Sequence, residues 1–222
     1  DSNIDSTGRH AITAYGDTKN TRISNHSVAP NGDAHIIGPK VGSSAIAFDG
    51  TDDYLSVASS TDFDFGTGDF TLEMWCNSSN LLTTTHVYLF DMRDGTSRIT
   101  ITSNAASSNG IWFGDGWGNI TDWQFPTDEW FHIAVCRQSG TGRAYLNGVL
   151  KSSVSSFTTN FGGTWTTHIG DKYNNDVNSE LKGYLDEIRL SNTARYPDGT
   201  TFTPSTTAFT SDANTKLLIH SN

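Results

Sequence analysis

The sequence contains only four glutamates, Glu73, Glu129, Glu180 and Glu187, so 20 of its 24 acidic residues are aspartates. Glutamate is a good helix former, whereas aspartate favours turns and caps. No segment of the chain shows a sustained helical period. The 21 glycines, together with abundant Ser, Thr and Asn, indicate many turns. The composition therefore argues against a helical fold.

Basic residues are also scarce: 14 Lys and Arg stand against 24 acidic residues, and the formal net charge is −10. Proteins that bind nucleic acid or an anionic membrane surface need a basic patch that displaces counterions from phosphates. We therefore expect neither as a partner. A surface this acidic is compatible with cation sites.

Long apolar runs are absent from the sequence. No stretch of about 18 apolar residues could span a bilayer. The first residues also lack the charged and then apolar pattern of a secretory leader. We expect no membrane insertion.

Cysteine is limited to Cys76 and Cys136, each at the far end of a strand-like segment. The two could form a disulfide if adjacent strands bring their Cα atoms within about 7 Å. The alternative is two reduced thiols packed as small hydrophobes in a core. Zinc binding is not expected, because neither cysteine has another cysteine or a histidine at ligand spacing.

The clearest pattern that is present is strict alternation over residues 70–75. Phe70, Leu72 and Met74 share one face, and the three intervening residues share the other. This pattern predicts a half-buried β-strand. The dipeptide Asn147-Gly148 lies between two further strand-like runs and predicts a tight hairpin, because a type I′ turn needs positive φ at both central positions. Other predicted strands cover residues 44–48, 54–57, 86–91, 97–102, 110–113, 168–170 and 183–190.

Three blocks carry a family resemblance: FDGTDDYLSVASSTDFDFGTGDFTLEMW (48–75), WFHIAVCRQSGTGRAYLNGVLKSS (130–153) and GYLDEIRLSNTARY (183–196). In this order they resemble the laminin-G-like, concanavalin A-like jelly-roll domains, and the resemblance covers nearly the whole chain. It implies an all-β fold, a two-sheet antiparallel jelly-roll sandwich, and one laminin-G-like domain over residues 1–222. Residues 217–219 are expected to form the closing strand of this domain. Alternatively, that strand awaits a neighbouring chain and acts as an assembly arm.

Catalysis is considered because the resembled group includes glycan hydrolases. A retaining hydrolase needs two carboxyl groups about 5–5.5 Å apart. The only dense acidic strand carries Asp186 and Glu187, which are adjacent in sequence and should therefore point to opposite faces. We expect no enzymatic activity.

The resemblance also implies a structural calcium ion between the first aspartate turn and the last Asp-Glu strand. Carried over by position, its ligands are Asp5, the carbonyl of Gly8 and Asp186, with Asp49 as a further candidate. Calcium takes 6–8 oxygen ligands, which turns rich in Asp and Gly can supply. Alternatively, Asp5 only caps its own turn, and Asp186 pairs with a cation such as Arg189.

Three aromatic residues stand in loops among Gly, Asn and Asp, namely Trp117, Trp165 and Tyr173. A sugar ring has an apolar face that packs on an aromatic ring, while neighbouring polar side chains bind its hydroxyls. These residues are predicted to contact a glycan. The alternative is that a Trp plugs the end of the sandwich.

The amino-acid sequences of these blocks are most similar to copies found in bacteriophage tail-fibre and virion-surface proteins. We therefore expect a non-catalytic recognition module, extracellular or on a virion surface as a tail-fibre or capsid decoration domain. It would bind a glycan or host-surface polysaccharide, with other virion proteins as further partners. One alternative is a carbohydrate-binding module of a secreted bacterial enzyme or adhesin. Another is a purely structural virion building block.

Overall fold

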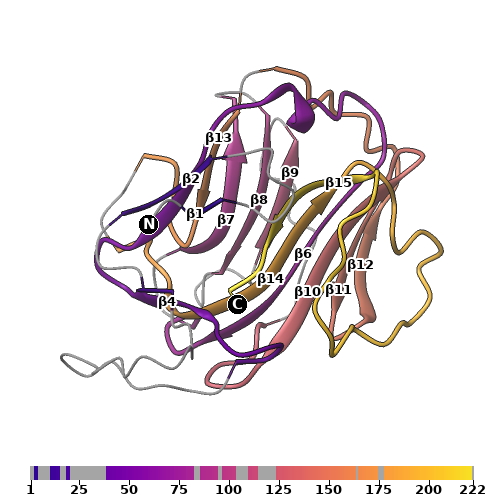
Figure 1. Cartoon of the computed structure of the whole chain (residues 1–222). Coiled ribbons are helices and arrows are strands. Elements are labelled where there is room, and N and C mark those ends of the chain that lie inside the picture. Colours follow the sequence, from indigo (N-terminus) through magenta and orange to yellow (C-terminus); the bar gives the residue numbers. More distant parts are fainter. Residues whose placement is uncertain are drawn as a thin grey trace.

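The computed structural model of the chain consists of two antiparallel β-sheets packed face to face (Figure 1). The structure describes residues 3–4, 11–15, 19–20, 39–82, 86–94, 97–103, 110–114, 124–163, 165–174 and 178–221. Among these residues the only helical segment is one 3₁₀ turn, Thr61–Phe63. The predicted all-β, two-sheet sandwich is thus confirmed. No helix within the described residues is long and apolar enough to cross a membrane.

The first sheet has seven strands. In spatial order they are β1 (Asn3–Ile4), β2 (Ala11–Tyr15), β5 (Tyr54–Val57), β13 (Thr166–Ile169), β7 (Val87–Arg93), β8 (Arg98–Ser103) and β9 (Gly110–Gly114).

The second sheet has eight strands. Its order is β12 (Val149–Val154), β11 (Thr141–Leu146), β10 (Phe131–Gln138), β6 (Phe70–Ser78), β14 (Lys182–Ser191), β4 (Ile46–Asp49) and β3 (Lys19–Asn20), and β15 (Thr215–Ile219) pairs with β14. Strand β15 contains the predicted closing segment, so the prediction that residues 217–219 complete this fold is confirmed.

One hydrophobic core lies between the sheets. It draws Leu72 and Met74 from β6 and Phe90 and Met92 from β7, all completely buried. The alternation of β6 predicts these inward positions correctly.

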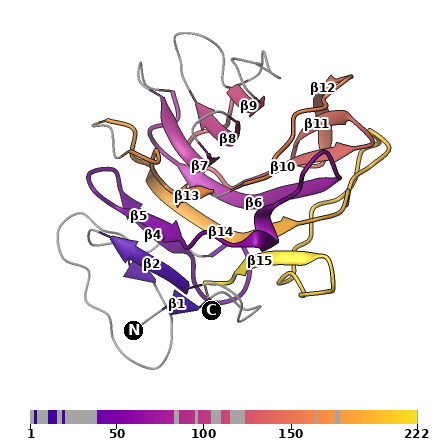
Figure 2. The same cartoon turned by 90° about the horizontal axis from the view of Figure 1, so that it is seen from above.

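The prediction that β6 is half-buried is wrong, because all nine of its residues are buried. Residues 192–214, which connect β14 to β15 and are called the cover segment below, pack on the outer face of the eight-stranded sheet. Figure 2 shows this connection on the side of that sheet away from the seven-stranded one. A second, smaller apolar cluster joins Cys136 and Tyr145 of the sheet to Tyr196 and Phe202 of the cover segment.

The predicted hairpin turn is present between β11 and β12. Asn147 and Gly148 have φ values of 50° and 78°, as a type I′ turn requires. The Gly148 carbonyl also accepts a hydrogen bond of 3.0 Å from the Phe202 amide. A Cβ at position 148 would lie only 1.8 Å from the Phe202 carbonyl oxygen. Glycine is therefore needed for the turn and for the docking of the cover segment.

Candidate functional site

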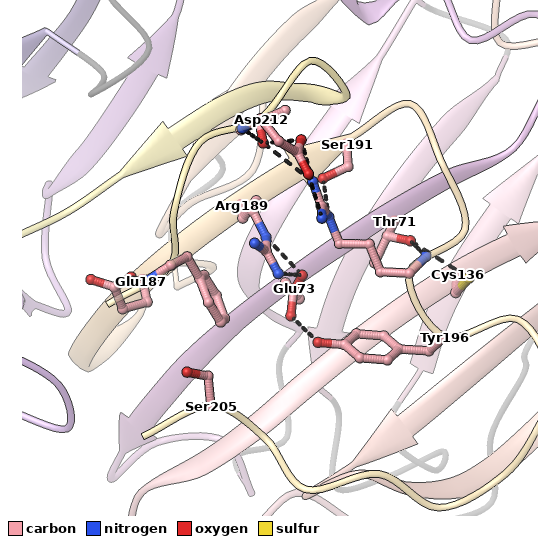
Figure 3. A network of polar contacts seen from close by, with 12 residues as sticks. Thr71, Glu73, Cys136, Glu187, Arg189, Ser191, Tyr196, Ser205 and Asp212 are labelled. Atoms are coloured by element: carbon pink, nitrogen blue, oxygen red, sulfur yellow. Dashed lines mark hydrogen bonds and ion pairs between the residues drawn. The ribbon is translucent and has the colours of Figure 1, made fainter. Parts of the chain in front are cut away.

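The outer face of the eight-stranded sheet carries a buried polar network (Figure 3). Glu73 is fully buried at its centre, and Arg189 donates two hydrogen bonds, of 2.9 and 2.7 Å, to its Oε1. The Tyr196 hydroxyl donates to Oε2 at 2.7 Å, and His132 Nε2 lies 3.3 Å from the same oxygen. Burial opposes ionisation of Glu73, but the His132 contact and the Arg189 charge outweigh it, so its pKa lies below the ordinary value.

Further contacts fix the cover segment over this network. Phe202 stacks on Tyr196 with 3.7 Å between ring centroids, and the Tyr145 hydroxyl donates to the Tyr196 carbonyl at 2.8 Å. Arg195 Nε donates to the Ser191 hydroxyl of β14 at 2.7 Å, and its guanidinium also pairs with Asp212 within the segment, at 3.1 and 2.9 Å. A ligand could reach the face below only by displacing these contacts. This face is therefore a poor candidate for a binding site.

The prediction that Asp186 and Glu187 point to opposite faces of their strand is wrong. Strand β14 bulges between Asp186 and Arg189, and Glu187 has a φ of 51°. The bulge turns both carboxylates toward the covered side, where Glu187 accepts from the Phe209 amide and contacts His220. Both side chains are nevertheless fully buried and engaged in internal hydrogen bonds. A substrate therefore has no access to this pair.

Two of the predicted calcium ligands, Asp49 and Asp186, lie within the described residues, and they do not lie together. Asp49 pairs with Lys182 across β4 and β14, whereas Asp186 lies four residues further along β14, about 13 Å away at roughly 3.3 Å per residue. Asp186 Oδ2 accepts from the Val41 amide at 2.9 Å, and Oδ1 accepts from the Ser221 hydroxyl at 2.8 Å. Burial raises its pKa to about 6, and the nearby charge of Glu187 adds to the shift. Asp49 and Asp186 therefore cannot ligate the same ion.

Asp5 and Gly8 lie outside the described residues, so the predicted turn at the start of the chain has no described counterpart. Asp49 itself lies near two other carboxylates. One oxygen each of Asp49, Asp52 and Asp53 lie within 4.8 Å of one another. This donor set suits calcium, which would need further oxygens from backbone or water.

The three aromatic residues predicted to contact a glycan differ in where the structure places them. Trp117 lies outside the described residues. Trp165 is only 1% exposed and belongs to the core cluster, beside Phe161 at 5.9 Å between ring centroids. The prediction that Trp165 contacts a glycan is therefore wrong, and its alternative, a Trp plugging the sandwich, describes the residue. Tyr173 is 40% exposed.

Tyr173 lies in the connection between β13 and β14, which packs on the outer face of the seven-stranded sheet. The connection leaves β13 through Gly170, whose φ of 90° favours glycine. A Cβ at position 170 would lie 2.3 Å from the Phe48 ring. Two side chains fix the backbone at Lys172. The Asp171 carboxylate accepts from the Lys172 amide at 2.6 Å, and His168 Nδ1 lies 3.1 Å from the Lys172 carbonyl oxygen.

Asp91 and Arg93 of β7 lie directly beneath Tyr173. Asp91 Oδ2 accepts a hydrogen bond of 3.0 Å from the Tyr173 amide. The Arg93 guanidinium lies over the Tyr173 ring, 4.5 Å from its centroid, and donates two hydrogen bonds to Asp91 Oδ1. The exposed ring is thus attached to a rigid strand rather than carried by a free loop tip.

Titratable groups around this connection have shifted pKa values. Burial raises the pKa of Asp171 to about 6, although hydrogen bonds from Ser179 and the Lys172 amide oppose the shift. Burial lowers the pKa of His168, whose ring stacks on Tyr54 at 4.5 Å. Perturbed groups gather at binding sites and also at structural networks, so they support a site here only together with the exposed ring.

The sequence singles out Tyr173 as a candidate but does not point to Asp91 and Arg93, the residues that hold it. A register shift in β7 between Tyr88 and Phe90 breaks the alternation, so Asp91 and Arg93 do not follow the pattern set by the first residues of the strand. Their spacing of two residues was the available signal.

Both cysteines are free thiols. Cys76 lies opposite Phe131 and Cys136 lies opposite Thr71 in the pairing of β6 with β10, five residues or about 17 Å apart. Cys76 belongs to the main core and Cys136 to the cluster under the cover segment. Of the two possibilities left by the sequence, the reduced pair is confirmed.

These features define a two-sheet jelly-roll domain with one covered outer face and an aromatic-bearing connection on the other. The chain belongs to the concanavalin A-like lectin/glucanases superfamily, whose family pattern matches residues 49–199. None of the curated protein sequences matches the chain significantly.

Several solved structures share the fold. Domain 4 of an extracellular arabinanase from Geobacillus stearothermophilus, solved with arabinotriose, is 23% identical with a TM-score of 0.63, over 89% of this chain and 90% of that one. A putative carbohydrate binding protein from Bacteroides ovatus is 15% identical with a TM-score of 0.57, over 79% and 50%. The receptor binding domain of botulinum neurotoxin mosaic serotype C/D is 14% identical with a TM-score of 0.56, over 86% and 45%. The chain thus spans half or less of the last two proteins.

Proposed function

We propose that this protein is a non-catalytic glycan-recognition module that binds sugar through Tyr173. The observation that carries the proposal is an exposed aromatic ring held by Asp91 and Arg93 on the outer face of the seven-stranded sheet. An exposed, pre-positioned ring can stack on the apolar face of a sugar with little loss of side-chain freedom. The sugar bound to the similar arabinanase domain lends support to this class of ligand.

The test is calorimetric titration of the protein with arabinotriose and a glycan array that includes neutral and acidic polysaccharides. We expect Tyr173→Ala to weaken binding at least about tenfold, because it removes the stacking surface. The matched control is Val149→Ala, which shortens a side chain 44% exposed on β12 of the other sheet. Equal loss in both variants, or none in either, would contradict the assignment to Tyr173.

The absence of catalysis belongs to the same proposal. Asp186 and Glu187, the one acidic pair singled out from the sequence, are buried and hydrogen-bonded internally. Incubation with each polysaccharide that binds should release no reducing ends. Hydrolysis of any of them would overturn the proposal, and its loss or survival in Asp186→Asn and Glu187→Gln would show whether this pair is responsible.

We propose an extracellular setting for the module. The leading version is a virion-surface domain of a tail fibre or capsid decoration. It is supported by the similarity of the three sequence blocks to copies found in bacteriophage proteins. A carbohydrate-binding module of a secreted enzyme is supported by the arabinanase domain, of which the chain covers 90%. Neighbouring genes distinguish the two: structural virion genes favour the first, and a glycoside hydrolase sequence in the same reading frame favours the second. If the protein binds no glycan on the array, the purely structural alternative is favoured.

A further inference from the structure

Asp91 is unusual among the outward-facing residues of the seven-stranded sheet, because it is a fully buried carboxylate bound from three elements. Its Oδ1 accepts from Arg93 on the same strand, at 2.9 and 2.6 Å, and from the Thr100 hydroxyl on β8 at 2.7 Å. Its Oδ2 accepts from the Tyr173 amide. Burying a carboxylate is costly unless its oxygens are satisfied, and here donors fill both.

The two oxygens act on Tyr173 by different routes. Oδ2 fixes the backbone at Tyr173 directly. Oδ1 fixes the Arg93 guanidinium, whose position over the Tyr173 ring then restricts the ring itself. Because a guanidinium is planar and donates in a fixed fork, it can bind Asp91 in its plane and stack on the ring with its face. Asp91 therefore controls both the backbone and the ring of the exposed aromatic residue.

We infer that Asp91, acting through Arg93, is the positioning residue that holds Tyr173 as a rigid stacking platform for a sugar ring. The inference rests on the proposed function for its ligand. The energetic reason is that an aromatic side chain fixed before binding loses little conformational freedom when the sugar arrives. Neither residue needs to touch the sugar itself.

A purely structural role for Asp91 would also lower stability on substitution, so stability alone does not test the inference. The position of the Tyr173 ring does. In protein carrying ¹³C-labelled tyrosine, the Tyr173 ring resonance is assigned by its disappearance in Tyr173→Phe. The variants are Arg93→Lys, which keeps the positive charge but loses the planar fork, and Asp91→Asn, which keeps the shape but weakens the acceptors.

We expect the Tyr173 resonance to move in both variants, while the ring resonance of Tyr145, which is fully buried under the cover segment, remains in place. Affinity for arabinotriose, or for the best polysaccharide on the array, should fall about threefold to tenfold in both. Val149→Ala should leave the resonance and the affinity at wild-type values. If Asp91→Asn fails to fold, Arg93→Lys alone decides the outcome.

The inference is overturned if the Tyr173 resonance stays in place in the variants that fold, or if affinity stays within twofold of wild type while Tyr173→Ala loses binding. If the wild-type protein binds none of the probes, the proposed function fails. The resonance then decides by itself whether Asp91 and Arg93 position the ring.

Discussion

At the scale of single residues, this protein buries several charged side chains and satisfies each by a different means. Glu73 is held by the side chains of Arg189 and Tyr196, whereas Arg137 donates to backbone carbonyls. The guanidinium of Arg137 is completely buried, and donates to three backbone carbonyls, at 2.6, 2.7 and 2.8 Å. Burial lowers its pKa to about 10, which still leaves it charged at neutral pH.

Arg137 connects two loops that contribute no strand to the sheets. Its acceptors are the carbonyls of Gly66, Gly68 and Thr159, and its guanidinium lies 4.9 Å from the Phe161 ring centroid. We expect Arg137→Met to lower the free energy of unfolding by about 3 kcal/mol, because three carbonyls lose a charged donor. Urea denaturation measures this, with Lys151→Met, which removes an exposed positive charge on β12, as the control. An unchanged midpoint would contradict the role.

Calcium binding is a residue-scale prediction, and the candidate site within the described residues is Asp49, with Asp52 and Asp53 beside it. If these carboxylates bind calcium, a chelator should lower the midpoint of thermal unfolding, since a bound ion stabilises the folded state by mass action. The shift should disappear in Asp49→Ala. A midpoint that does not respond to chelation in the wild-type protein would end the calcium prediction.

At the scale of elements, the cover segment decides which face of the molecule is available. It docks through Tyr196, whose hydroxyl donates to Glu73 and whose carbonyl accepts from the Tyr145 hydroxyl, while Phe202 of the same segment stacks on its ring. Because the outer face of the eight-stranded sheet is closed by these contacts, the exposed aromatic residue on the opposite sheet becomes the better candidate for recognition.

The hydroxyl and the ring of Tyr196 are separable by mutation. We expect Tyr196→Phe to lower the free energy of unfolding by about 1–2 kcal/mol, since a buried charged acceptor loses one donor while the stacking remains. Amide exchange should quicken in residues 192–214 more than in β7 or β8. Uniform exchange over both sheets would contradict a local effect on the cover segment.

The elements differ in how far sequence predicts them. The strand at 70–75 and the turn at Asn147-Gly148 follow from local alternation and turn chemistry, so both were predictable. The cover segment has no periodicity, and its docking depends on contacts such as that between Glu73 and Tyr196, 123 residues apart. Trp165 was misplaced for the same reason: its glycine-rich neighbours resemble an exposed loop, but its ring packs into the core.

At the scale of the whole molecule, buried carboxylates with raised pKa values make stability depend on pH. The pKa of Asp186 is about 6 in the folded state, against an ordinary value of 3.8. Between these values the folded protein holds a proton that the unfolded chain releases. The contribution of Asp186 to stability therefore rises as pH falls from about 7 to 4.

We expect this contribution to vanish in Asp186→Asn. Relative to wild type, the variant should be most stable at pH 8 and lose up to about 2 kcal/mol of that advantage by pH 4.5. Denaturation curves of both proteins across this range measure the difference, and other titrating groups cancel in it. A difference that is constant with pH would show that Asp186 keeps an ordinary pKa.

The long separation between Glu73 and its partners also has a consequence for the order in which the protein forms during synthesis. Strand β6 leaves the ribosome well before Arg189 and Tyr196, which lie 116 and 123 residues downstream of Glu73. Until these two residues are synthesised, the Glu73 carboxylate remains hydrated. The edge of nascent β6 that later pairs with β14 also remains exposed to solvent. We expect the last docking event to be slow and the newborn chain to be prone to association before it occurs.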